Sequence, residues 1–600
     1  MSTTVDPARL GDPEIDALAG AYGRDPEAIL PILRALQARR GTLTPEAIAA
    51  VAAALQIPPA RAYGVASFYA LLHTGSAPRP SIRLCDGPVC WLRGATQVRA
   101  ALEGACPTPG AIGRTSCLGL CDCAPAALAG MQQCGPVSAE QIHDLLSAAD
   151  GSTAQTFAAP TYVQPRVGEK RVLLARAGVV DPDSIDSALA QGSYRVLADA
   201  LKHPRECVIA EIEEAGLRGR GGAGFPTGRK LRMVASAAPE TAPRYVVCNA
   251  DESEPLVFKD RVLIDADPHL LLEGIGLAAF ATGAQEGFIY IRGEYTAQAA
   301  RLERAIAQAE AHGWLGEHIA GSDWSFRLHL HQGAGAYICG EESALLESLE
   351  GRRGEPRIRP PYPSTHGYRG CPTLVDNVET LAAIPAIVAN GAAWYHALGP
   401  TGTGGTKLYT LLGHVNRPGL FEAPFGLTLR QIVDDYGGGM AGGSTFNFAL
   451  TGGAAGTIVP PALLDLPIDY NSGRQGVALG AGAFLICDQT VSPVALVREL
   501  LHFFEVESCG KCIPCRVGTR QARGLLDRLV AGAGRPGDLR QLAQLAELME
   551  QASFCGLGQS AAIPIKSALL HFGSAFEAAC GGSIDVEEEV YDGNHVALRE

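Results

Sequence analysis

The 600-residue sequence predicts a multidomain α/β protein, and three observations support this fold class. The chain is longer than one hydrophobic core normally organises, and 47% of its residues are apolar, so at least three domains are expected. Segments with helical apolar spacing alternate with strand-like runs such as RYVVCNA and GFIYIRG, which is typical of α/β layers. Two groups of cysteines predict metal sites within this framework.

The first 80 residues predict a helical bundle, which a compact α/β unit follows. Apolar residues recur at helical spacing from Glu27 to Arg40, and Thr44 followed by Pro45 is a typical start for a second helix. The alternating segment SIRLC, residues 81–85, then introduces strands that alternate with helices to about residue 148.

The later blocks are separated by changes in composition. Residues 150–170 are rich in Pro, Ser, Thr and Gly without apolar periodicity, which predicts a linker. An α/β layered domain is expected from about 171 to 400, and Gly-rich turns between short runs predict a small β domain from about 407 to 486. The remainder is mostly helical in its spacing.

Charge and hydropathy disfavour several classes of partner. The formal net charge is −14, the same sign as nucleic acid and anionic membranes, so neither is expected as a main partner. No N-terminal signal is seen, and the most apolar stretch, from His269 to Ala284, is interrupted by Glu273 and too short to span a bilayer. We therefore expect a cytoplasmic protein whose cysteines are thiols or metal ligands rather than disulfides.

The C-terminal cysteines predict a [4Fe-4S] cluster. SCGKCIPCRVG places Cys509, Cys512 and Cys515 at intervals of three, but Thr519 stands where a bacterial ferredoxin would have its fourth cysteine. Cys555, in SFCGLGQS beyond helical sequence, is the predicted fourth ligand. Zinc and plain core cysteines are the alternatives, although structural zinc sites usually pair two CxxC-like units.

The N-terminal cysteines predict a [2Fe-2S] centre. CDGPVC supplies Cys85 and Cys90, and CLGLC supplies Cys117 and Cys121, so four thiolates come from two loops. Cys123 could replace Cys121, and a cysteine-rich loop without metal is the remaining alternative.

The glycine-rich loop GRGGAGFPTGRK, residues 219–230, predicts a site for a phosphate or a flat ring. It formally contains G-x-G-x-x-G, but the preceding segment ECVIAEIEEAGL has helical spacing rather than the strand that the dinucleotide fingerprint requires. Glycines allow backbone N–H groups to approach a ligand, and Arg220 and Lys230 supply positive charge for phosphate. The alternative is a flexible surface loop.

Two acidic segments predict acceptors for hydroxyl and amide groups. The strand RYVVCNA leads into a loop with Asn249, Asp251, Glu252, Ser253 and Glu254. In GAGAYICGEESALL, Gly340, Glu341 and Glu342 open a helix, where acidic residues are also favoured by the helix dipole alone.

Five motifs then reveal a family resemblance. RGRGGAGFPTGRK, CNADESEP, AYICGEESALL, VDNVET and SCGKCIPCRVG with Cys555 closely resemble, in this order, the NADH-oxidising flavoprotein subunit of respiratory complex I. The N-terminal part resembles the 24-kDa-type subunit of the same complex. Fusion of both resembles the diaphorase flavoprotein (alpha) subunit of cytosolic NAD-reducing [NiFe] hydrogenases.

The resemblance implies the identity of each block and its cofactors, FMN, NAD, [4Fe-4S] and [2Fe-2S]. The implied order is a helical bundle (1–80), a thioredoxin-like [2Fe-2S] domain (81–149), a linker (150–170), a Rossmann-like FMN- and NAD-binding α/β domain (171–400), a ubiquitin-like β-grasp (SLBB-like) domain (401–490) and a helical [4Fe-4S] domain (491–600).

Site residues are carried over from the resemblance by matching motifs. The residues implied for FMN are Gly219, Arg220, Gly221, Gly222, Lys230, Asn249, Asp251, Glu252, Ser253, Tyr337, Gly340, Glu341, Val375, Asp376, Asn377 and Thr380. NAD(H) would lie over the flavin, with Phe225 at the adenine, Arg359 and Tyr362 nearby, and Glu254 and Glu342 at its polar groups. These two glutamates are the predicted catalytic residues, although no side chain need act as a nucleophile.

The predicted function follows from electron counting. Nicotinamide transfers two electrons as hydride, whereas iron–sulfur clusters accept one at a time, so a flavin is the needed converter. The chain is expected to pass electrons between NAD(H), FMN and the clusters, with an iron–sulfur partner subunit and hydrogenase subunits as partners. Alternatives are the flavoprotein subunit of an NAD-dependent formate dehydrogenase, a complex I-like NADH dehydrogenase, and a non-catalytic electron relay or assembly scaffold.

Overall fold

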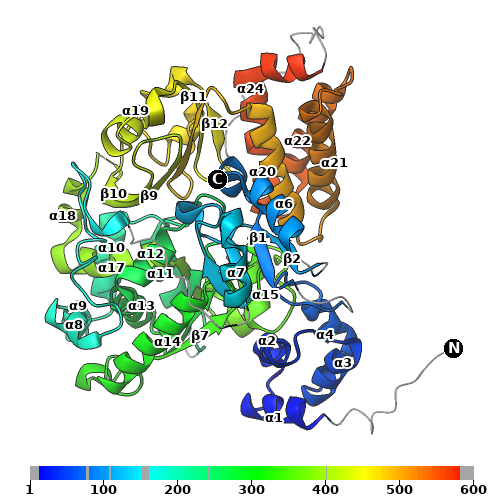
Figure 1. Ribbon diagram of the computed structural model, residues 1–600. Helices are drawn as coiled ribbons and strands as arrows, with labels where there is room; N and C mark the ends of the chain where they lie inside the picture. Colours follow the sequence, from blue (N-terminus) through cyan, green and yellow to red (C-terminus); the bar gives the residue numbers. More distant parts are fainter. Residues whose placement is uncertain are drawn as a thin grey trace.

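A computed structural model describes residues 12–75, 80–106, 108, 110–149, 151, 161–239, 242–400 and 402–580. Figure 1 shows the N-terminal helices (blue) at the lower right, the central α/β part at the lower left, and the last helices (orange to red) at the upper right. Residues 150 and 152–160 of the predicted linker lie outside the described residues. The predicted domain boundaries remain a prediction.

The N-terminal block is a small helical bundle, as the spacing predicted. Its helices are α1 (Pro13–Ala21), α2 (Ile29–Arg40), α3 (Pro45–Ala54) and α4 (Pro59–Ala66). Thr44 is the N-cap of α3 and accepts a hydrogen bond from the Ala47 N–H group at 3.2 Å. The bundle is fixed to the central domain through the Tyr69 hydroxyl, which lies 2.6 Å from Ser348 Oγ.

A four-stranded sheet in the order β2-β1-β3-β4 forms the thioredoxin-like domain. Its elements are β1 (Ile82–Cys85), α5 (Pro88–Leu92), α6 (Ala95–Ala105), β2 (Ile112–Thr115), β3 (Ala127–Ala129), β4 (Gln132–Cys134) and α7 (Ile142–Ala149). Strand β1 pairs in parallel with β2 and antiparallel with β3, so the cysteine-bearing end of β1 lies inside the sheet.

The central domain is built on a parallel sheet with the strand order β7-β6-β5-β8. The strands are β5 (Tyr245–Ala250), β6 (Glu286–Ile291), β7 (Arg327–Gln332) and β8 (Thr373–Asn377). Numbered within this domain, the order is 3-2-1-4, which is that of a Rossmann-like sheet. The order reverses between β5 and β8, and ligands bind at the carboxyl ends of the strands on either side of such a point.

Helices surround this sheet in the central domain, and Figure 1 labels many of them. They are α8 (Ile185–Ala190), α9 (Arg195–Ala200), α10 (Glu206–Ala215), α11 (Thr227–Ala235), α12 (Lys259–Ala266), α13 (Pro268–Thr282), α14 (Thr296–Ala311), α15 (Glu342–Leu349), α16 (Pro363–His366), α17 (Val378–Asn390) and α18 (Ala392–Ala397). Nearly every side chain of α13 is buried, which explains why its sequence is largely apolar apart from His269 and Glu273.

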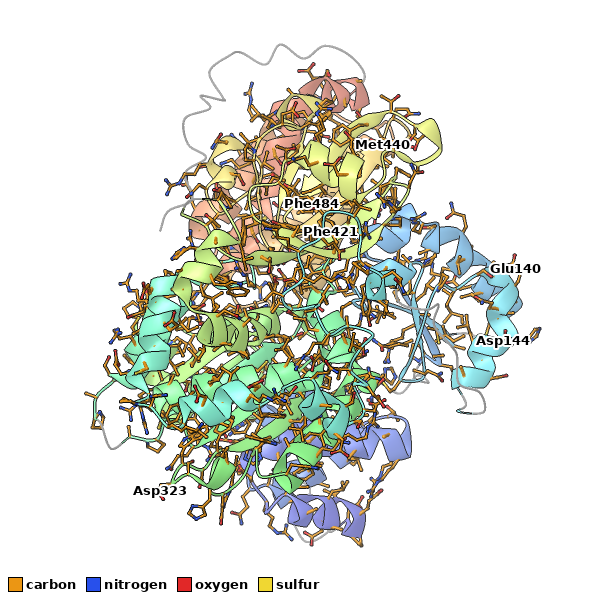
Figure 2. All side chains as sticks on the ribbon, turned by 90° about the vertical axis from the view of Figure 1, so that its left-hand side faces the viewer. Glu140, Asp144, Asp323, Phe421, Met440 and Phe484 are labelled. Carbon is orange, nitrogen blue, oxygen red and sulfur yellow. The ribbon has the colours of Figure 1, made fainter. Side chains whose placement is uncertain are left out.

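The β-grasp domain is a five-stranded mixed sheet in the order β10-β9-β13-β11-β12. Its elements are β9 (Thr406–Gly413), β10 (Gly419–Pro424), α19 (Leu429–Gln431), β11 (Phe446–Thr451), β12 (Thr457–Val459) and β13 (Ala483–Asp488). It has its own apolar core, in which Figure 2 labels Phe421 and Phe484. The buried Lys407 Nζ lies 2.6 Å from Glu379 Oε2, so an ion pair joins β9 to α17.

The C-terminal block is a helical bundle beside the β-grasp domain (Figure 1). Its helices are α20 (Pro493–Glu507), α21 (Ile513–Val530), α22 (Asp538–Ala552), α23 (Gly556–Ser560) and α24 (Ala562–Ala579). Within the described part of the chain, no helix combines the length and apolarity that crossing a membrane requires.

The substitution Gly274→Ala tests the close packing of α13 on α17. A Cβ at Gly274 would overlap the backbone carbonyl of Leu381, which cannot move without shifting α17. We expect a loss of about 2–3 kcal/mol and a lower thermal midpoint for the central domain. Gly276→Ala is the matched control, because its Cβ would meet only the end of the Leu197 side chain, at 3.1 Å. Equal midpoints for the two variants would contradict this packing.

Candidate functional site

The predicted flavin residues converge where the strand order of the central sheet reverses. Strands β5 and β8 are parallel neighbours, so Asn249 and Asn377 lie side by side at their carboxyl ends. The glycine-rich loop packs on this edge: a Cβ at Gly221 would lie 3.6 Å from the Asn377 side chain. The Arg220 N–H group donates to Thr380 Oγ1 at 2.8 Å, so the VDNVET motif anchors the loop.

The glycine-rich loop is a closed, structured turn. Helix α10 precedes it and α11 follows it, which confirms that its G-x-G-x-x-G pattern does not follow a strand. The Gly219 N–H group donates to the Phe225 carbonyl at 2.8 Å and closes the loop. Gly222 and Gly224 have φ angles of +122° and +66°, which explains the need for glycine there. These contacts give the loop a defined conformation, and whether it binds a ligand or is a flexible surface loop remains a prediction.

Lys230 links the loop to both acidic segments. Its Nζ donates to the Val375 carbonyl at 2.8 Å and lies 3.3 Å from Asp376 Oδ1 and 3.9 Å from Glu342 Oε2. Burial alone would lower the pKa of Lys230, but the two carboxylates raise it. The buried Asp376 Oδ2 has no hydrogen-bond partner within the described chain. An orphaned acceptor at this edge fits a ligand hydroxyl, such as those of the ribityl chain of FMN.

The Arg220 side chain has contacts to the β-grasp domain that sequence reasoning did not foresee. Its guanidinium is buried, donates to the hydroxyls of Tyr395 and Tyr470, and lies 4.5 Å from the centre of the Phe425 ring. These contacts tie the loop to the β-grasp domain. That this charge also serves a phosphate remains a prediction.

The loop after β5 is held by its own polar groups. Asn249 Nδ2 donates to the Gly340 carbonyl at 2.8 Å, which joins the two acidic segments. Burial raises the pKa of Asp251 to about 7, although Arg292 and a hydrogen bond from Ser253 oppose this shift. Glu252 accepts from two backbone N–H groups, and burial raises its pKa to about 7 as well.

Glu254 faces the β-grasp domain. Its carboxylate accepts from the Ala455 N–H group at 2.9 Å and from the Tyr337 hydroxyl at 3.3 Å. Burial raises the pKa of Glu254 to about 7. The small β domain, to which the sequence assigned no chemistry, thus supplies a contact to a predicted nucleotide residue.

The second acidic segment lies at the N-terminus of α15. Glu341 is the N-cap and accepts from the Ala344 N–H group at 3.0 Å. Arg359 Nη1 lies 2.9 Å from Glu342 Oε1 and 3.3 Å from Glu341 Oε1. Phe225 and Tyr362 are 41% and 52% exposed, so both rings have free surface for a planar ligand. Their roles at the nucleotide remain predictions.

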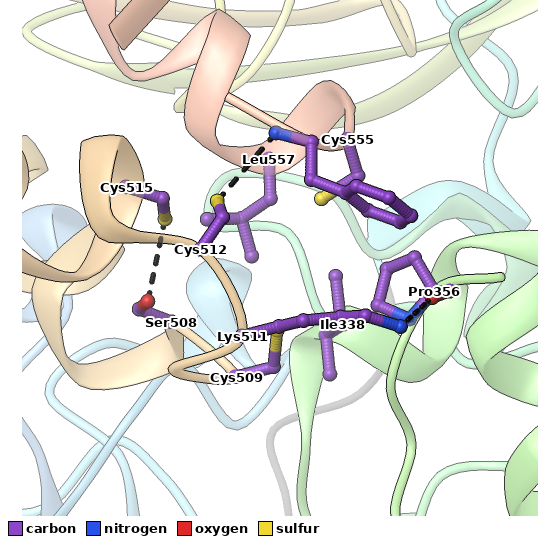
Figure 3. Close-up of a pocket in the computed structure, with 10 residues that line it drawn as sticks. Ile338, Pro356, Ser508, Cys509, Lys511, Cys512, Cys515, Cys555 and Leu557 are labelled. Carbon is purple, nitrogen blue, oxygen red and sulfur yellow. Dashed lines mark hydrogen bonds between the residues drawn. The ribbon is translucent and has the colours of Figure 1, made fainter. Parts of the chain in front are cut away.

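Figure 3 shows that the remote Cys555 lies in one pocket with Cys509, Cys512 and Cys515. The Phe554 N–H group donates to Cys512 Sγ at 3.5 Å, which holds the SFCGLGQS loop against the CxxCxxC segment. Ser508 Oγ lies 3.3 Å from Cys515 Sγ. Four thiols line one pocket, and two of them, Cys512 and Cys515, have a hydrogen-bonding group beside the sulfur. This donor set fits a [4Fe-4S] cluster.

The N-terminal quartet is also assembled. Cys85 interacts with Cys90 and Cys117, and Cys117 Sγ lies 3.5 Å from Cys121 Sγ. Hydrogen bonds from Cys121 and Cys85, and the charge of Arg292, lower the pKa of Cys117. Cys123 lies outside this group and interacts with Asp122 instead. The donor set therefore fits a [2Fe-2S] centre and favours Cys121 over Cys123.

Sequence reasoning missed the buried charges between these sites. Arg292 follows β6 directly, so it lies at the same edge of the sheet as the predicted flavin residues. Glu507 accepts from the Tyr337 N–H group at 2.8 Å and directly precedes the SCGKC motif. Both positions could have been found, because carboxyl ends of parallel strands share one edge and cluster motifs need supporting groups.

The fold and the site together define an oxidoreductase with sites for FMN, NAD, a [2Fe-2S] centre and a [4Fe-4S] cluster. Four family patterns match the chain: "Thioredoxin-like [2Fe-2S] ferredoxin" at residues 15–150, "Nuo51 FMN-binding domain" at 212–386, "SLBB domain" at 408–459 and "NADH-ubiquinone oxidoreductase-F iron-sulfur binding region" at 495–579. The predicted multidomain fold is thereby confirmed.

Sequence identity with individual relatives identifies the family. The F 2 subunit of the NADH-quinone oxidoreductase of Rhizobium meliloti is 44% identical over 409 residues, which cover 68% of this chain and 97% of that protein. NADP-reducing hydrogenase subunit HndC of Solidesulfovibrio fructosivorans is 41% identical over 68% of this chain and 83% of that protein. The chain belongs to the family of the NADH dehydrogenase flavoprotein subunits, the F subunits of NADH-quinone oxidoreductases.

A solved structure is similar over almost the whole chain. A chain in the crystal structure of an NAD+-reducing [NiFe]-hydrogenase in the air-oxidized state has a TM-score of 0.79 and 34% sequence identity. The match covers 94% of this chain and 95% of that one. The resemblance noted from the motifs is therefore confirmed.

Cys121→Ser and Cys123→Ser together test the assignment of the [2Fe-2S] ligands. We expect the first variant to lose the electron paramagnetic resonance (EPR) signal of the reduced centre and the second to keep it, because the Cys121 sulfur lies 3.5 Å from the Cys117 sulfur. The opposite pattern would make Cys123 the ligand.

Cys555→Ser tests the [4Fe-4S] site. We expect its iron content to fall by one cluster, because this thiol is the remote corner of the pocket. Cys580→Ser is the control, since Cys580 lies outside that pocket and should leave the iron content unchanged. Full iron content in Cys555→Ser would contradict the assignment.

Proposed function

We propose that this chain is the diaphorase flavoprotein subunit of an NAD-reducing [NiFe] hydrogenase. One observation carries the proposal. The match with the Rhizobium meliloti protein covers 97% of that protein but only 68% of this chain, whereas the match with the hydrogenase chain covers 94% of this chain. The fused thioredoxin-like part is thus a shared feature with the hydrogenase. Its partners would be an iron–sulfur subunit of the diaphorase module and the hydrogenase subunits.

The described residues support a specific role for each part of the site. The glycine-rich loop and the ends of β5 and β8 would hold FMN, through the sixteen residues assigned above from the resemblance. When bound, FMN accepts paired electrons from NADH and releases them singly to iron–sulfur clusters. Lys230 and the backbone N–H groups of the loop supply positive potential, and Asp376 supplies a free acceptor.

The pyridine nucleotide would lie on the open side of the flavin. Phe225, Arg359 and Tyr362 are surface residues around the two acidic segments, and Glu342 lies between Arg359 and Lys230. The Cys509 pocket adjoins the Tyr337 segment, because Ile338 lines that pocket. The cluster would thus lie next to a residue predicted to flank the flavin.

A second candidate function has a specific observation in its favour. The Rhizobium meliloti relative belongs to an NADH-quinone oxidoreductase, so a complex I-like NADH dehydrogenase would use the same central and C-terminal domains. A formate dehydrogenase flavoprotein would share them as well. Purification of the native complex separates these functions: a nickel-iron subunit supports the hydrogenase, and a molybdenum subunit or a quinone-reducing complex would overturn that assignment.

The basic activity is tested by adding NADH to the anaerobic holoprotein. We expect the flavin absorbance to bleach and an artificial dye to be reduced, because the nucleotide and flavin sites adjoin. A colourless, iron-free protein would leave only the scaffold alternative.

Glu342→Gln tests the nucleotide side of the site. We expect the KM for NADH to rise about tenfold, equivalent to about 1.4 kcal/mol, with flavin content unchanged, because a charged acceptor is lost at the rim. The control is Glu317→Gln, which removes an exposed carboxylate paired with Arg327. Loss of flavin with an unchanged KM would contradict this placement.

A further inference from the structure

A single buried arginine joins the flavin loop to the [2Fe-2S] loop. Arg292 is 3% exposed and directly follows β6. Its Nη1 donates to the Glu252 carbonyl at 2.7 Å, and its Nη2 donates to the Cys117 carbonyl at 2.5 Å. The planar guanidinium thus spans from a residue of the CNADESEP motif to a predicted [2Fe-2S] ligand.

Neighbouring contacts also hold the CNADESEP loop and the CLGLC loop in fixed positions relative to each other. The Tyr295 hydroxyl donates to Glu252 Oε2 at 3.1 Å, and its ring packs so closely on Gly119 that a Cβ there would overlap it. Arg261 Nε donates to the Gly119 carbonyl at 3.2 Å. The CLGLC loop is therefore seated against the central domain by side chains of that domain.

Two buried arginines contact the backbone of the CLGLC loop, and each is also paired with acidic residues. Arg261 is paired with Asp122 at 2.6 Å and with Asp265 at 3.7 Å. Arg292 is paired with Glu294, which lies 3.1 Å from both its Nε and its Nη2, and the same Nη2 also donates to the Cys117 carbonyl.

A carboxylate also contacts this loop. Glu507 interacts with Ser116, next to Cys117, and accepts from the Tyr337 N–H group. Arg292 is thus the cation that contacts the backbone of a predicted cluster ligand. In a buried setting, a cation there favours the additional negative charge of a reduced cluster.

We propose that Arg292 is a positioning residue that holds the [2Fe-2S] loop against the flavin loop and raises the midpoint potential of the [2Fe-2S] centre. The inference rests on the proposed function, which supplies the electrons. The step concerned is a one-electron reduction of the centre, with NADH as the reductant through the flavin, and no covalent bond forms or breaks. Arg292 stabilises the product of this step by its charge.

The variants Arg292→Gln and Arg292→Lys distinguish the effect of the positive charge of Arg292 from the effect of its guanidinium geometry. The glutamine variant keeps an N–H donor without the charge, and the lysine variant keeps the charge without the two-pronged contact. The measurement is a redox titration of the holoprotein, followed by the EPR signal of the reduced [2Fe-2S] centre. We expect the reduction equilibrium constant to fall about tenfold in Arg292→Gln, which is about 59 mV toward lower potential, and to stay near wild type in Arg292→Lys.

Arg176→Gln is the matched control. Arg176 is a largely buried arginine of the same domain, paired with Asp267 and Ser193 and not with a cysteine loop, so the potential should not change. An unchanged midpoint in Arg292→Gln, or an equal shift in the glutamine and lysine variants, would overturn the inference. Loss of the centre in both Arg292 variants would also overturn it, since the role would then be structural. Absence of the signal in the wild-type holoprotein would instead overturn the proposed function.

Discussion

The arrangement of this molecule depends on the reversal of strand order between β5 and β8. At such a reversal a crevice forms beyond the carboxyl ends of the strands, and unpaired backbone N–H and C=O groups face it. Polar side chains are suited to this position because they can form hydrogen bonds with those groups or with a ligand. Asn249 and Asp376 lie at these two strand ends, and the glycine-rich loop closes over them. The β-grasp domain also reaches this region, because its Ala455 N–H group donates to Glu254.

Buried charged residues hold the neighbouring domains against the central domain. The Lys407–Glu379 pair fixes the β-grasp sheet to α17, and Glu254 binds the turn that ends in Ala455. Arg292 does the same for the thioredoxin-like domain through the Cys117 carbonyl. Removing one partner of such a buried pair leaves an uncompensated charge, which is much more costly than losing a surface ion pair. The interdomain geometry is therefore held by a few polar contacts in addition to apolar packing.

Much of the architecture could be predicted from local sequence. Spacing predicted the α2 and α3 helices and the Thr44 cap, and the strand-like RYVVCNA segment is β5. The apolar spacing before the glycine-rich loop predicted a helix, which is α10. The usual dinucleotide fingerprint requires a strand at this place, so it was excluded. Cysteine intervals predicted that Cys555 would meet a segment forty residues away, since an incomplete ligand set demands a fourth thiol.

Contacts between domains could not be predicted in this way. Nothing in the spacing around Arg220 indicates that its guanidinium contacts Tyr395 and Tyr470. The bridging role of Arg292 depends on how the thioredoxin-like domain docks, which is a property of two surfaces and not of one motif. Side-chain direction at such interfaces is decided by tertiary packing, for which single-sequence patterns carry no signal.

The measurement that bears most directly on this arrangement is a crystal structure of the anaerobic holoprotein with iron located by anomalous scattering. An isoalloxazine ring is expected between the glycine-rich loop and Tyr337, with separate iron peaks inside the Cys509–Cys555 pocket and among Cys85, Cys90, Cys117 and Cys121. Flavin bound away from the ends of β5 and β8, or a Cys509–Cys555 pocket without iron in a fully active protein, would contradict it.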